Sequence, residues 1–567
     1  MTQRFWGEVP PATSVSTDEA EVLARDVFGI AATARPLGSN QETNLLLRTT
    51  DAAYVLKVAN PAFGRDVLDL QNAAMRHLAG TAGLRVPVPV PAPDGSDVVV
   101  VDMGGAPHHV RLLTFVPGEL LSDAGHLAEP TLRRLGGLAA HVAAGLSGFD
   151  HPAADRPLQY DPRRAAEVVG ALAPSVNDPD RRSAAVALSE HAWSALTPVA
   201  GVLRTQVVHA DLADYNVVAG RDREGRPDPD GVIDFGDVLR SWLVGDLATC
   251  VASLLARPRS RPVTDACAVA AGYHAVLPLT EPEVEALWPL VAARAAVLAV
   301  SADDILAADP ANTYAREEQP LDWRIVERVG DVPFELAHEA LRQALGLDPS
   351  SRVRRALAWR PDRPVVDPGP SPVALDLSVR TDLLPDGAWL ERAAVRAAVD
   401  AALAGRPGLL RYGEGRLPDV VTDSADETPT VSLGAGLVVP AGTPVRAPAD
   451  GTVRSTDHAE SAGDGTVLVL ACDRVDVVLG GLVPSLRPGD AVAAGDVVGA
   501  VAPAPASPAL PPHVHVQVVA ATGLVPPRLA APSLAHAWRA LCPDPAPLLG
   551  LEEDAPDEPG PDDVLAR

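Results

Sequence analysis

The sequence predicts a multidomain protein in which an α+β part with two lobes precedes a small all-β barrel or sandwich. The chain has 567 residues, too many for a single hydrophobic core. Strand patterns dominate up to about residue 118, and amphipathic helical patterns follow to about residue 350. From residue 426 onward the pattern changes to Val-rich strands split by Gly and Pro turns.

The composition narrows the classes of partner. Hydrophobic residues make up 47% and charged residues 21%, as in soluble globular proteins. The formal net charge of −27 argues against nucleic acid and anionic membranes as main partners. It suits a cationic small molecule as a ligand, but the acidity can equally serve only to keep the chain soluble. With no signal peptide, no apolar span and no paired cysteines, a reduced, cytoplasmic protein is expected. The cysteines are Cys250, Cys267, Cys472 and Cys542.

Residues 1–118 predict the first lobe. Ser16 and Glu19 form a capping box ahead of a helix that Gly29 closes. A second helix is expected at 66–79. The predicted strands are 45–47, 54–58, 85–92, 97–103 and 110–120. These elements form a small antiparallel lobe that ends in a hinge near residues 114–118.

Residues 119–350 predict a helical lobe. Its amphipathic segments are 129–147, 162–173, 181–200, 245–256, 263–275, 281–307 and 332–346. Only the stretch 205–240 interrupts them with strands. A β-rich lobe, a hinge and a helical lobe together predict a nucleotide-dependent enzyme whose site lies in the cleft between the lobes.

The stretch 205–240 carries the chemistry. It contains His209-Ala210-Asp211, then Asn216, then Asp234-Phe235-Gly236 after a short apolar run. One loop carboxylate can orient and deprotonate an acceptor hydroxyl, while an amide and a second carboxylate hold Mg²⁺ against nucleotide phosphates. The order H-x-D-x₄-N followed by D-F-G matches the kinase signature set.

Lys57 is the single lysine among the 47 basic residues. It lies near the end of the run Tyr54-Val55-Leu56-Lys57-Val58, on a strand where kinases carry the lysine that contacts the α- and β-phosphates. A compact ammonium fits between phosphates and a carboxylate, whereas a forked guanidinium does not. We therefore expect Lys57 to bind ATP.

Two neighbouring features depart from the kinase pattern. The helix glutamate that usually pairs with this lysine aligns with Gln71, and Asp69 is the other nearby candidate. The phosphate-covering loop LGSNQETN has only Gly38, but Ser39 and Asn40 can present backbone N–H groups to the phosphates.

With these motifs in place, residues 1–350 resemble the aminoglycoside phosphotransferase/choline kinase family. The resemblance implies a protein-kinase-like fold that uses ATP and Mg²⁺ to phosphorylate hydroxyl groups of small, often cationic metabolites. It implies that Asp211 is the catalytic base and that Asn216 and Asp234 bind Mg²⁺. Lys57 would clamp the phosphates.

The resemblance also implies supporting roles. The hinge residues whose backbone would contact adenine are Thr114, Phe115 and Val116. His209 would orient the catalytic loop, and Asp246 would brace that loop or act only as an acid at the start of its helix. Asp237 would meet a substrate ammonium or remain a simple exposed carboxylate.

Within this family, the phrases KVANP and LDLQNAAMRHL resemble the hydroxylysine kinase-like branch. Later pieces are similar to bacterial fusions of a kinase, a peptidase-like barrel and a class III aminotransferase. These pieces are RYGEGR in the connector (351–425), PAGTPVRAPADGTV in the barrel and LCPDPAPLLG in the closing segment (523–567). The sequence stops where the aminotransferase would begin, which implies a separate class III aminotransferase or phospho-lyase as partner. The acidic, Pro-rich tail is expected to be disordered.

Residues 426–522 resemble the lysostaphin-type zinc peptidases. His513 and His515 match the His-x-His element and would share one face of a strand. The other ligand positions of that family align with Ser432, Gly436 and Gly481. A catalytic zinc site needs three protein ligands and water, so we expect a non-catalytic barrel with at most residual zinc binding at the two histidines.

The expected function is that of an ATP-dependent kinase for a hydroxyl group of an amine-bearing metabolite, either an amino alcohol or a hydroxyamino acid. The alternatives are an aminoglycoside-type antibiotic phosphotransferase, a zinc metallopeptidase and a non-catalytic scaffold with a kinase-like domain. The appended barrel argues against the first and the lost ligands against the second. The intact Lys57, Asp211, Asn216 and Asp234 argue against the third.

Overall fold

The computed structural model describes residues 13–38, 42–367, 371–384, 388–416, 427–458, 466–504, 509–520 and 523–551. The chain divides into two compact units, residues 1–345 and 346–567, each described here by itself. Ser39 and Asn40 of the predicted phosphate loop lie outside the described residues, as does the acidic tail after residue 551.

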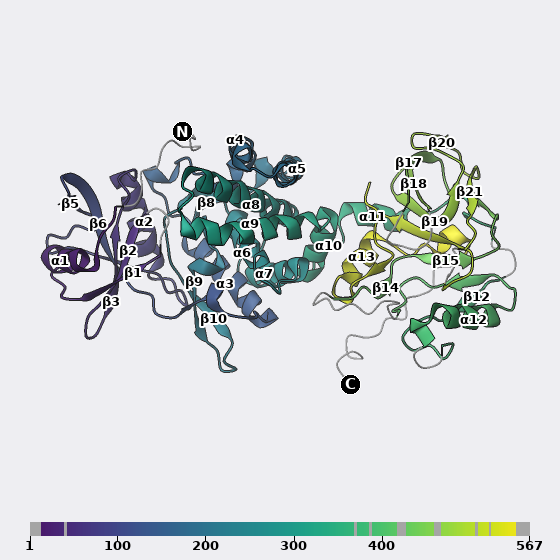
Figure 1. Ribbon diagram of the computed structural model, residues 1–567, viewed down its shortest axis with the longest axis horizontal. Coiled ribbons are helices and arrows are strands. Elements are labelled where there is room, and N and C mark those ends of the chain that lie inside the picture. The colour runs from purple at the N-terminus through teal and green to yellow at the C-terminus, as the bar shows by residue number, and fades with distance from the viewer. Residues whose placement is uncertain are drawn as a thin grey trace. The chain divides into compact units, whose positions relative to one another are not determined.

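The first lobe is an antiparallel sheet with helix α1 against it (Figure 1). The strands run in the order β1-β2-β3-β6-β4, and β5 pairs with β6. Their bounds are β1 Thr33–Leu37, β2 Thr43–Arg48, β3 Ala53–Val58, β4 Pro89–Val90, β5 Val99–Met103 and β6 Ala106–Thr114. The predicted strand at 110–120 is divided, because the chain leaves β6 at the hinge and begins β7 (Glu119–Leu120).

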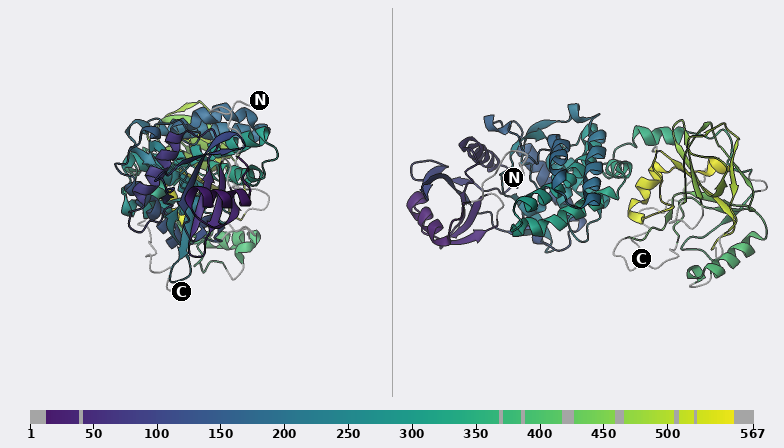
Figure 2. Two further views of the ribbon diagram at one scale, coloured as in Figure 1. Left: turned by 90° about the vertical axis from the view of Figure 1, so that its left-hand side faces the viewer. Right: turned by 45° about the horizontal axis from the view of Figure 1, so that its top comes forward.

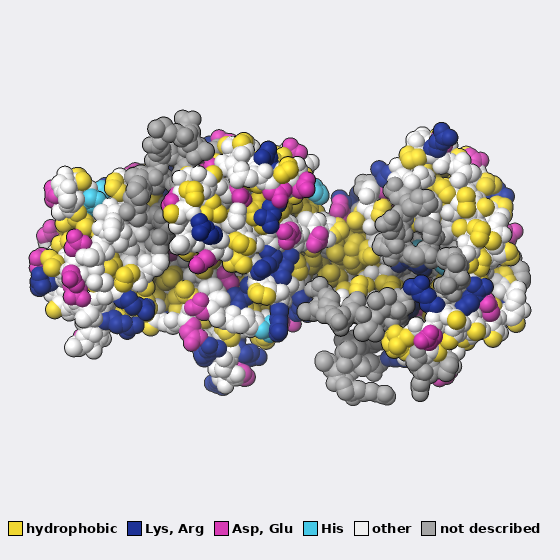
Figure 3. All heavy atoms as spheres, in the orientation of Figure 1, with side chains coloured by type: hydrophobic (Ala, Val, Ile, Leu, Met, Phe, Trp, Pro, Cys, Tyr) yellow, Lys and Arg dark blue, Asp and Glu magenta, His cyan; other side chains and the backbone are white. Residues whose placement is uncertain are grey.

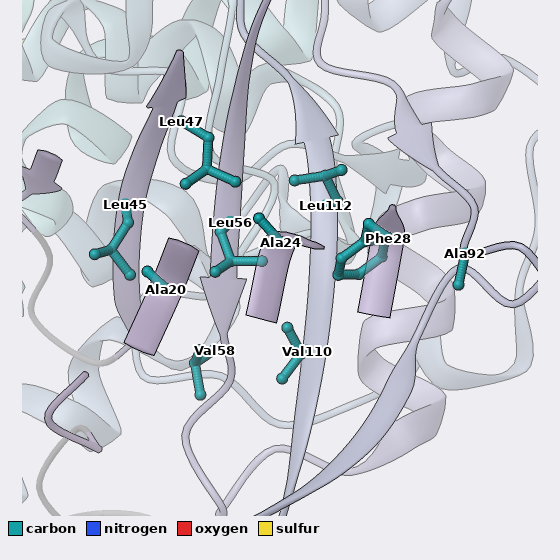
Figure 4. Packing of buried hydrophobic residues seen from close by; sticks show 10 residues of the cluster. All are labelled: Ala20, Ala24, Phe28, Leu45, Leu47, Leu56, Val58, Ala92, Val110 and Leu112. Carbon is teal, nitrogen blue, oxygen red and sulfur yellow. The ribbon is translucent and has the colours of Figure 1, made fainter. Parts of the chain in front are cut away.

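Helix α1 (Thr17–Phe28) begins at the predicted Ser16–Glu19 capping box and ends at Gly29, whose φ of 70° suits glycine. Its buried face packs on alternate residues of the central strands (Figure 4). Alternation places such residues on one face of a strand, so α1 and the sheet enclose one core. The residues that Figure 4 shows are Ala20, Ala24, Phe28, Leu45, Leu47, Leu56, Val58, Ala92, Val110 and Leu112.

The second lobe is a helical assembly beside the sheet lobe (Figure 2). Its helices are α3 Glu129–Gly145, α4 Ala165–Leu172, α5 Pro179–Leu196, α6 Val244–Leu255, α7 Pro262–Val276, α8 Glu281–Ala308, α9 Thr313–Gly330 and α10 Phe334–Ala344. Helices α3 and α7 approach closely at two glycines. A Cβ on Gly136 would lie 1.9 Å from the Val269 carbonyl oxygen, and one on Gly272 would lie 1.9 Å from the Arg133 carbonyl oxygen.

Helix α9 is the main element that the sequence prediction missed. Its Pro320 and its many charged residues hide an amphipathic pattern. The signal that was available is its N-cap, where the Asn312 side chain accepts a hydrogen bond from the Ala315 N–H at 2.9 Å.

Four short strands frame the two motif loops in the second lobe. Their bounds are β8 Thr205–Val208, β9 Val217–Arg221, β10 Pro227–Val232 and β11 Leu239–Trp242. The pairs β8–β11 and β9–β10 are antiparallel, and β7 adds to β9. This pairing brings the loop after β8 next to the turn after β10.

The second unit is built on a ten-stranded sheet, with two further short strands paired separately. Its strands are β12 Val373–Leu375, β13 Gly408–Leu410, β14 Val431–Ser432, β15 Ala435–Val438, β16 Pro444–Arg446, β17 Gly451–His458, β18 Thr466–Cys472, β19 Asp476–Pro484, β20 Ala491–Val492, β21 Val497–Val501, β22 His513–Val519 and β23 Leu529–Ala530. Its helices are α11 Ser351–Ala358, α12 Arg392–Leu403 and α13 Ala535–Leu541.

The segment 351–425, which the sequence predicts as a connector, supplies β12 and β13 to this sheet. Leu375 and Leu410 of these strands pack with Val399 of α12 and Val438 of β15. Strands of three residues are too short to show a period of two in the sequence, which is why they escaped prediction.

The surface of the first unit carries charges of both signs. Figure 3 shows acidic and basic side chains scattered over its visible face without gathering in one large patch. Within the described residues no helix is long and apolar enough to cross a membrane.

Candidate active site

A buried carboxylate fixes the loop after β8. Both oxygens of Asp246, which is fully buried at the start of α6, accept backbone N–H groups: His209 at 3.0 Å and Ala210 at 2.7 Å. Ala210 has a φ of 67°, a strained value for a residue with a side chain, and these two hydrogen bonds hold it there. Asp246 therefore lies where a bracing residue is needed.

His209 joins the loop to the turn after β10. Its Nε2 lies 3.2 Å from the Ile233 carbonyl oxygen, and its ring meets the edge of Phe235 at a centroid distance of 4.8 Å. The ring is fully buried between these two contacts, which is a geometry that suits an orienting residue.

Asp211 is surrounded by hydrogen-bond donors. Asn216 Nδ2 donates to Oδ2 at 2.8 Å, the Tyr215 hydroxyl to Oδ1 at 3.0 Å, and Arg294 Nη2 to Oδ1 at 2.7 Å. The Arg294 guanidinium carbon lies 4.9 Å from the ring centroid of Tyr160. Neither Arg294 nor Tyr215 was predicted as a site residue. A lone arginine inside a helical pattern gives no local signal of such a contact.

Asp234 of the second lobe faces Lys57 of the first lobe. Lys57 Nζ lies 3.6 Å from Asp234 Oδ1. The Lys57 ammonium holds the pKa of Asp234 below its usual value, although burial opposes this. Burial alone would lower the pKa of Lys57, but the carboxylates of Asp234 and Glu42 raise it. Both groups are therefore ionised at neutral pH.

The prediction about the partner of this lysine needs correction. Lys57 Nζ lies 2.7 Å from Glu42 Oε2, in the residue just before β2. Asp69 instead pairs with Arg65 at 3.0 Å on the outside of α2 (Arg65–Leu78), and Gln71 Nε2 donates to the Gly236 carbonyl oxygen at 3.3 Å. The kinase pattern places this glutamate on the helix, and no local signal in the sequence marks Glu42 as the partner of Lys57.

The hinge residues contribute unequally. The N–H of Thr114 donates to the Val88 carbonyl oxygen at 2.9 Å, and that of Phe115 to the Ala53 carbonyl oxygen at 3.1 Å. These two groups serve the sheet of the first lobe. Within the described residues, Val116 is left as the candidate hinge N–H for an adenine ring.

Two carboxylates near Asp211 and its partner Arg294 have raised pKa values. Burial, reinforced by the charge of Asp211, raises the pKa of Asp237 to about 7. Burial and the neighbouring Glu318 raise the pKa of Asp322, on α9, to about 7. A cationic ligand that entered here would stabilise both ionised carboxylates. Asp322 was missed together with its helix.

The barrel of the second unit presents a different arrangement. His513 and His515 are buried on β22, and burial lowers the pKa of both, that of His515 to about 3. The charge of Arg416, which pairs with Glu414 at 2.8 Å, lowers both pKa values further. Across the described residues no group of three or more His, Cys, Asp and Glu side chains is placed to hold a metal ion.

Comparison with known proteins follows this division of the chain. Residues 33–287 match the phosphotransferase enzyme family and residues 430–527 match peptidase family M23. A homoserine kinase of Chelativorans sp. (strain BNC1) is 32% identical over 275 residues, which are 45% of this chain and 74% of that protein. A hydroxylysine kinase of Mus musculus is 25% identical over 316 residues, 51% of this chain and 82% of that protein. Among solved structures, a microcompartment-associated aminopropanol kinase is 20% identical with a TM-score of 0.43, covering 58% of this chain and 99% of that chain.

The fold and the matches define a small-molecule kinase with a two-lobed, kinase-like α+β architecture. The chain belongs to the phosphotransferase enzyme family, and its second unit carries a domain of peptidase family M23. Both resemblances drawn from the sequence are thereby confirmed.

Proposed function

We propose that this protein is an ATP- and Mg²⁺-dependent kinase that phosphorylates a hydroxyl group of an amine-bearing metabolite, an amino alcohol or a hydroxyamino acid. The observation that carries the proposal is the convergence of Lys57, Asp234 and Asp211 on one cleft beside two carboxylates of raised pKa.

The donor set fits a hard divalent cation. Both hydrogen bonds of Asn216 Nδ2 go to Asp211, at 2.8 and 2.9 Å, so the amide oxygen of Asn216 is turned away and left for a metal ion. The Asp234 side chain is 50% exposed and carries a negative charge. Such oxygen ligands suit Mg²⁺, which neutralises phosphate charge when bound.

The remaining steps belong to residues of the chain. Lys57 holds a phosphate of ATP with an N–H that its carboxylate partners do not use. Asp211 accepts the proton of the acceptor hydroxyl, which aligns the oxygen for attack on the γ-phosphorus. Arg294 and Tyr215 keep the carboxylate oriented by donating to Oδ1.

The two acidic residues Asp237 and Asp322 support an amine on the acceptor. Asp237 interacts with the charges of Asp211 and Arg294, and Asp322 with that of Arg294, so an ammonium bound beside them would replace the proton that burial favours. The relatives named as homoserine kinase and hydroxylysine kinase have amine-bearing substrates by name, in keeping with this acceptor class. The resemblance to kinase–aminotransferase fusions extends the proposal to a class III aminotransferase or phospho-lyase that would consume the phosphorylated amine.

A screen for ADP release tests the proposal. The protein is incubated with ATP, Mg²⁺ and single members of four panels: amino alcohols, hydroxyamino acids, aminoglycosides and simple alcohols that lack an amine. We expect turnover with one of the first two panels and none with simple alcohols that lack an amine. Turnover of aminoglycosides alone would instead support an antibiotic phosphotransferase.

A further inference from the structure

A buried charge cluster surrounds the ammonium of Lys57. Glu42 Oε2 lies 2.7 Å from Lys57 Nζ, and Glu42 Oε1 lies 3.3 Å from Arg111 Nη2. The side chains of Lys57 and Glu42 are each 8% exposed, and that of Arg111 is 1% exposed. Each oxygen of one carboxylate thus faces a different buried cation.

Arg111 holds the carboxylate from the neighbouring strand. Lys57 on β3 and Arg111 on β6 are directly paired in the antiparallel register, so their side chains lie on the same face of the sheet. Arg111 Nη1 donates to Asn72 Oδ1 of α2 at 3.3 Å. Burial lowers the pKa of Arg111 and the charge of Glu42 opposes that shift. Without Glu42, two like charges would face each other in the lobe interior.

Helix α2 therefore serves a different purpose from that of the kinase glutamate helix. Its Asn72 fixes Arg111, and its Gln71 donates to the carbonyl oxygen of Gly236 in the turn that carries Asp234. Asp69, the acid on this helix that might have replaced the glutamate, is 45% exposed and bonds to Arg65. The carboxylate that meets Lys57 comes from the start of β2.

We infer that Glu42 is the positioning residue for Lys57 and that Arg111 fixes Glu42 for this purpose. An ammonium has three N–H donors. Glu42 engages one of them and Asp234 faces another, which leaves one for a nucleotide phosphate. Without Glu42 the ammonium would turn toward Asp234 and compete for the carboxylate needed by the divalent cation. This inference rests on the proposed use of ATP but not on the identity of the acceptor.

The test replaces Glu42 by glutamine, which keeps the shape and removes the charge. We expect Glu42→Gln to weaken binding of ATP–Mg²⁺, measured by calorimetry on the full chain, by about 10- to 100-fold, because a charge-assisted hydrogen bond is lost. In turnover assays the KM for ATP should rise while the KM for the acceptor stays within about twofold. The matched control is Asp69→Asn, which removes a nearby acid from α2 and should leave ATP binding unchanged.

A double variant separates positioning from simple charge balance. If Glu42 only neutralises Arg111, then Glu42→Gln/Arg111→Met, which removes both charges, should restore ATP affinity as well as thermal stability. If Glu42 positions Lys57, the double variant should recover stability and still bind ATP weakly. Restored affinity, or unchanged affinity in Glu42→Gln alone, would overturn the inference. Failure to find an amine-bearing acceptor would overturn the proposed substrate class and leave this result standing.

Discussion

The proposed acceptor pocket makes the binding of an amine depend on pH through Asp237. This residue follows the Asp234-Phe235-Gly236 turn, and burial together with the charge of Asp211 raises its pKa to about 7. The charges of Arg156 and Arg294 oppose the shift without cancelling it. Below that pKa the carboxyl group is protonated and offers an ammonium no counter-charge. Above it the group is ionised and binds.

The magnitude follows from the ionised fraction. A carboxyl group with a pKa of about 7 is about one-tenth ionised at pH 6 and about nine-tenths ionised at pH 8. An alkylammonium, with a pKa near that of lysine at about 10.4, stays charged over this range. The KM for the acceptor should therefore fall about tenfold from pH 6 to pH 8, while the KM for ATP changes far less.

The assay measures acceptor KM by ADP release at saturating ATP in steps from pH 6 to pH 8, on the unaltered chain and on Asp237→Asn. The variant should raise the acceptor KM at pH 8 by about 10-fold or more and weaken its pH dependence, leaving only the part that the titration of Asp322 contributes. Asp26→Asn, which removes an acid with a 59% exposed side chain from α1, is the matched control. An unchanged pH profile in Asp237→Asn would refute the assignment of Asp237 to the ammonium.

Further predictions address other parts of the account. Asp211→Asn should lower kcat by about 10²- to 10⁴-fold while ATP binding persists in calorimetry, and full activity would contradict its role as base. Lys57→Arg should raise the KM for ATP at least about tenfold, since a forked guanidinium cannot occupy the site of the ammonium between Glu42 and Asp234. Asp322→Asn should raise Tm at pH 8 but not at pH 4. The pKa of Asp322 in the folded protein, about 7, lies above the usual value near 3.9. As the pH rises from about 4 to about 7, ionisation of this group therefore destabilises the folded state, and the variant removes that cost. Zinc added to the full chain should produce no peptidase activity and no change in Tm. A zinc-dependent rise in Tm that is lost in His515→Gln would instead reveal a metal site.

The parts of this fold that the sequence predicted are those with a local signal. The capping box at Ser16, the hairpin that ends in Lys57 and the motif residues around Asp211 all depend on neighbours in the chain. Local hydrogen bonds and side-chain alternation specify such elements before any tertiary contact forms. Strands β2, β3 and β5 and most helices were therefore found within a few residues of their bounds, whereas β1 was missed and the predicted strand 85–92 is a strand only at Pro89–Val90.

The parts that escaped prediction depend on contacts between distant segments. Glu42 meets Lys57 because β2 and β3 pair, and Arg111 joins them from a strand more than fifty residues later in the sequence. Arg294 reaches Asp211 from α8 across 83 positions. A buried cation of this kind looks, in the sequence, like an interruption of an apolar helix face. Only the packed structure shows that it points at a carboxylate.

The central claim is that Asp211 serves the transfer of a phosphoryl group from ATP to the hydroxyl of an amine-bearing metabolite. The most direct test is to identify the product by ³¹P NMR and mass spectrometry after incubation of the full chain with ATP, Mg²⁺ and the best acceptor. The account predicts a phosphate ester on the former hydroxyl, formed in step with ADP and lost in Asp211→Asn. ADP without a phosphorylated amine, phosphate attached to nitrogen, or equal product from Asp211→Asn would contradict it.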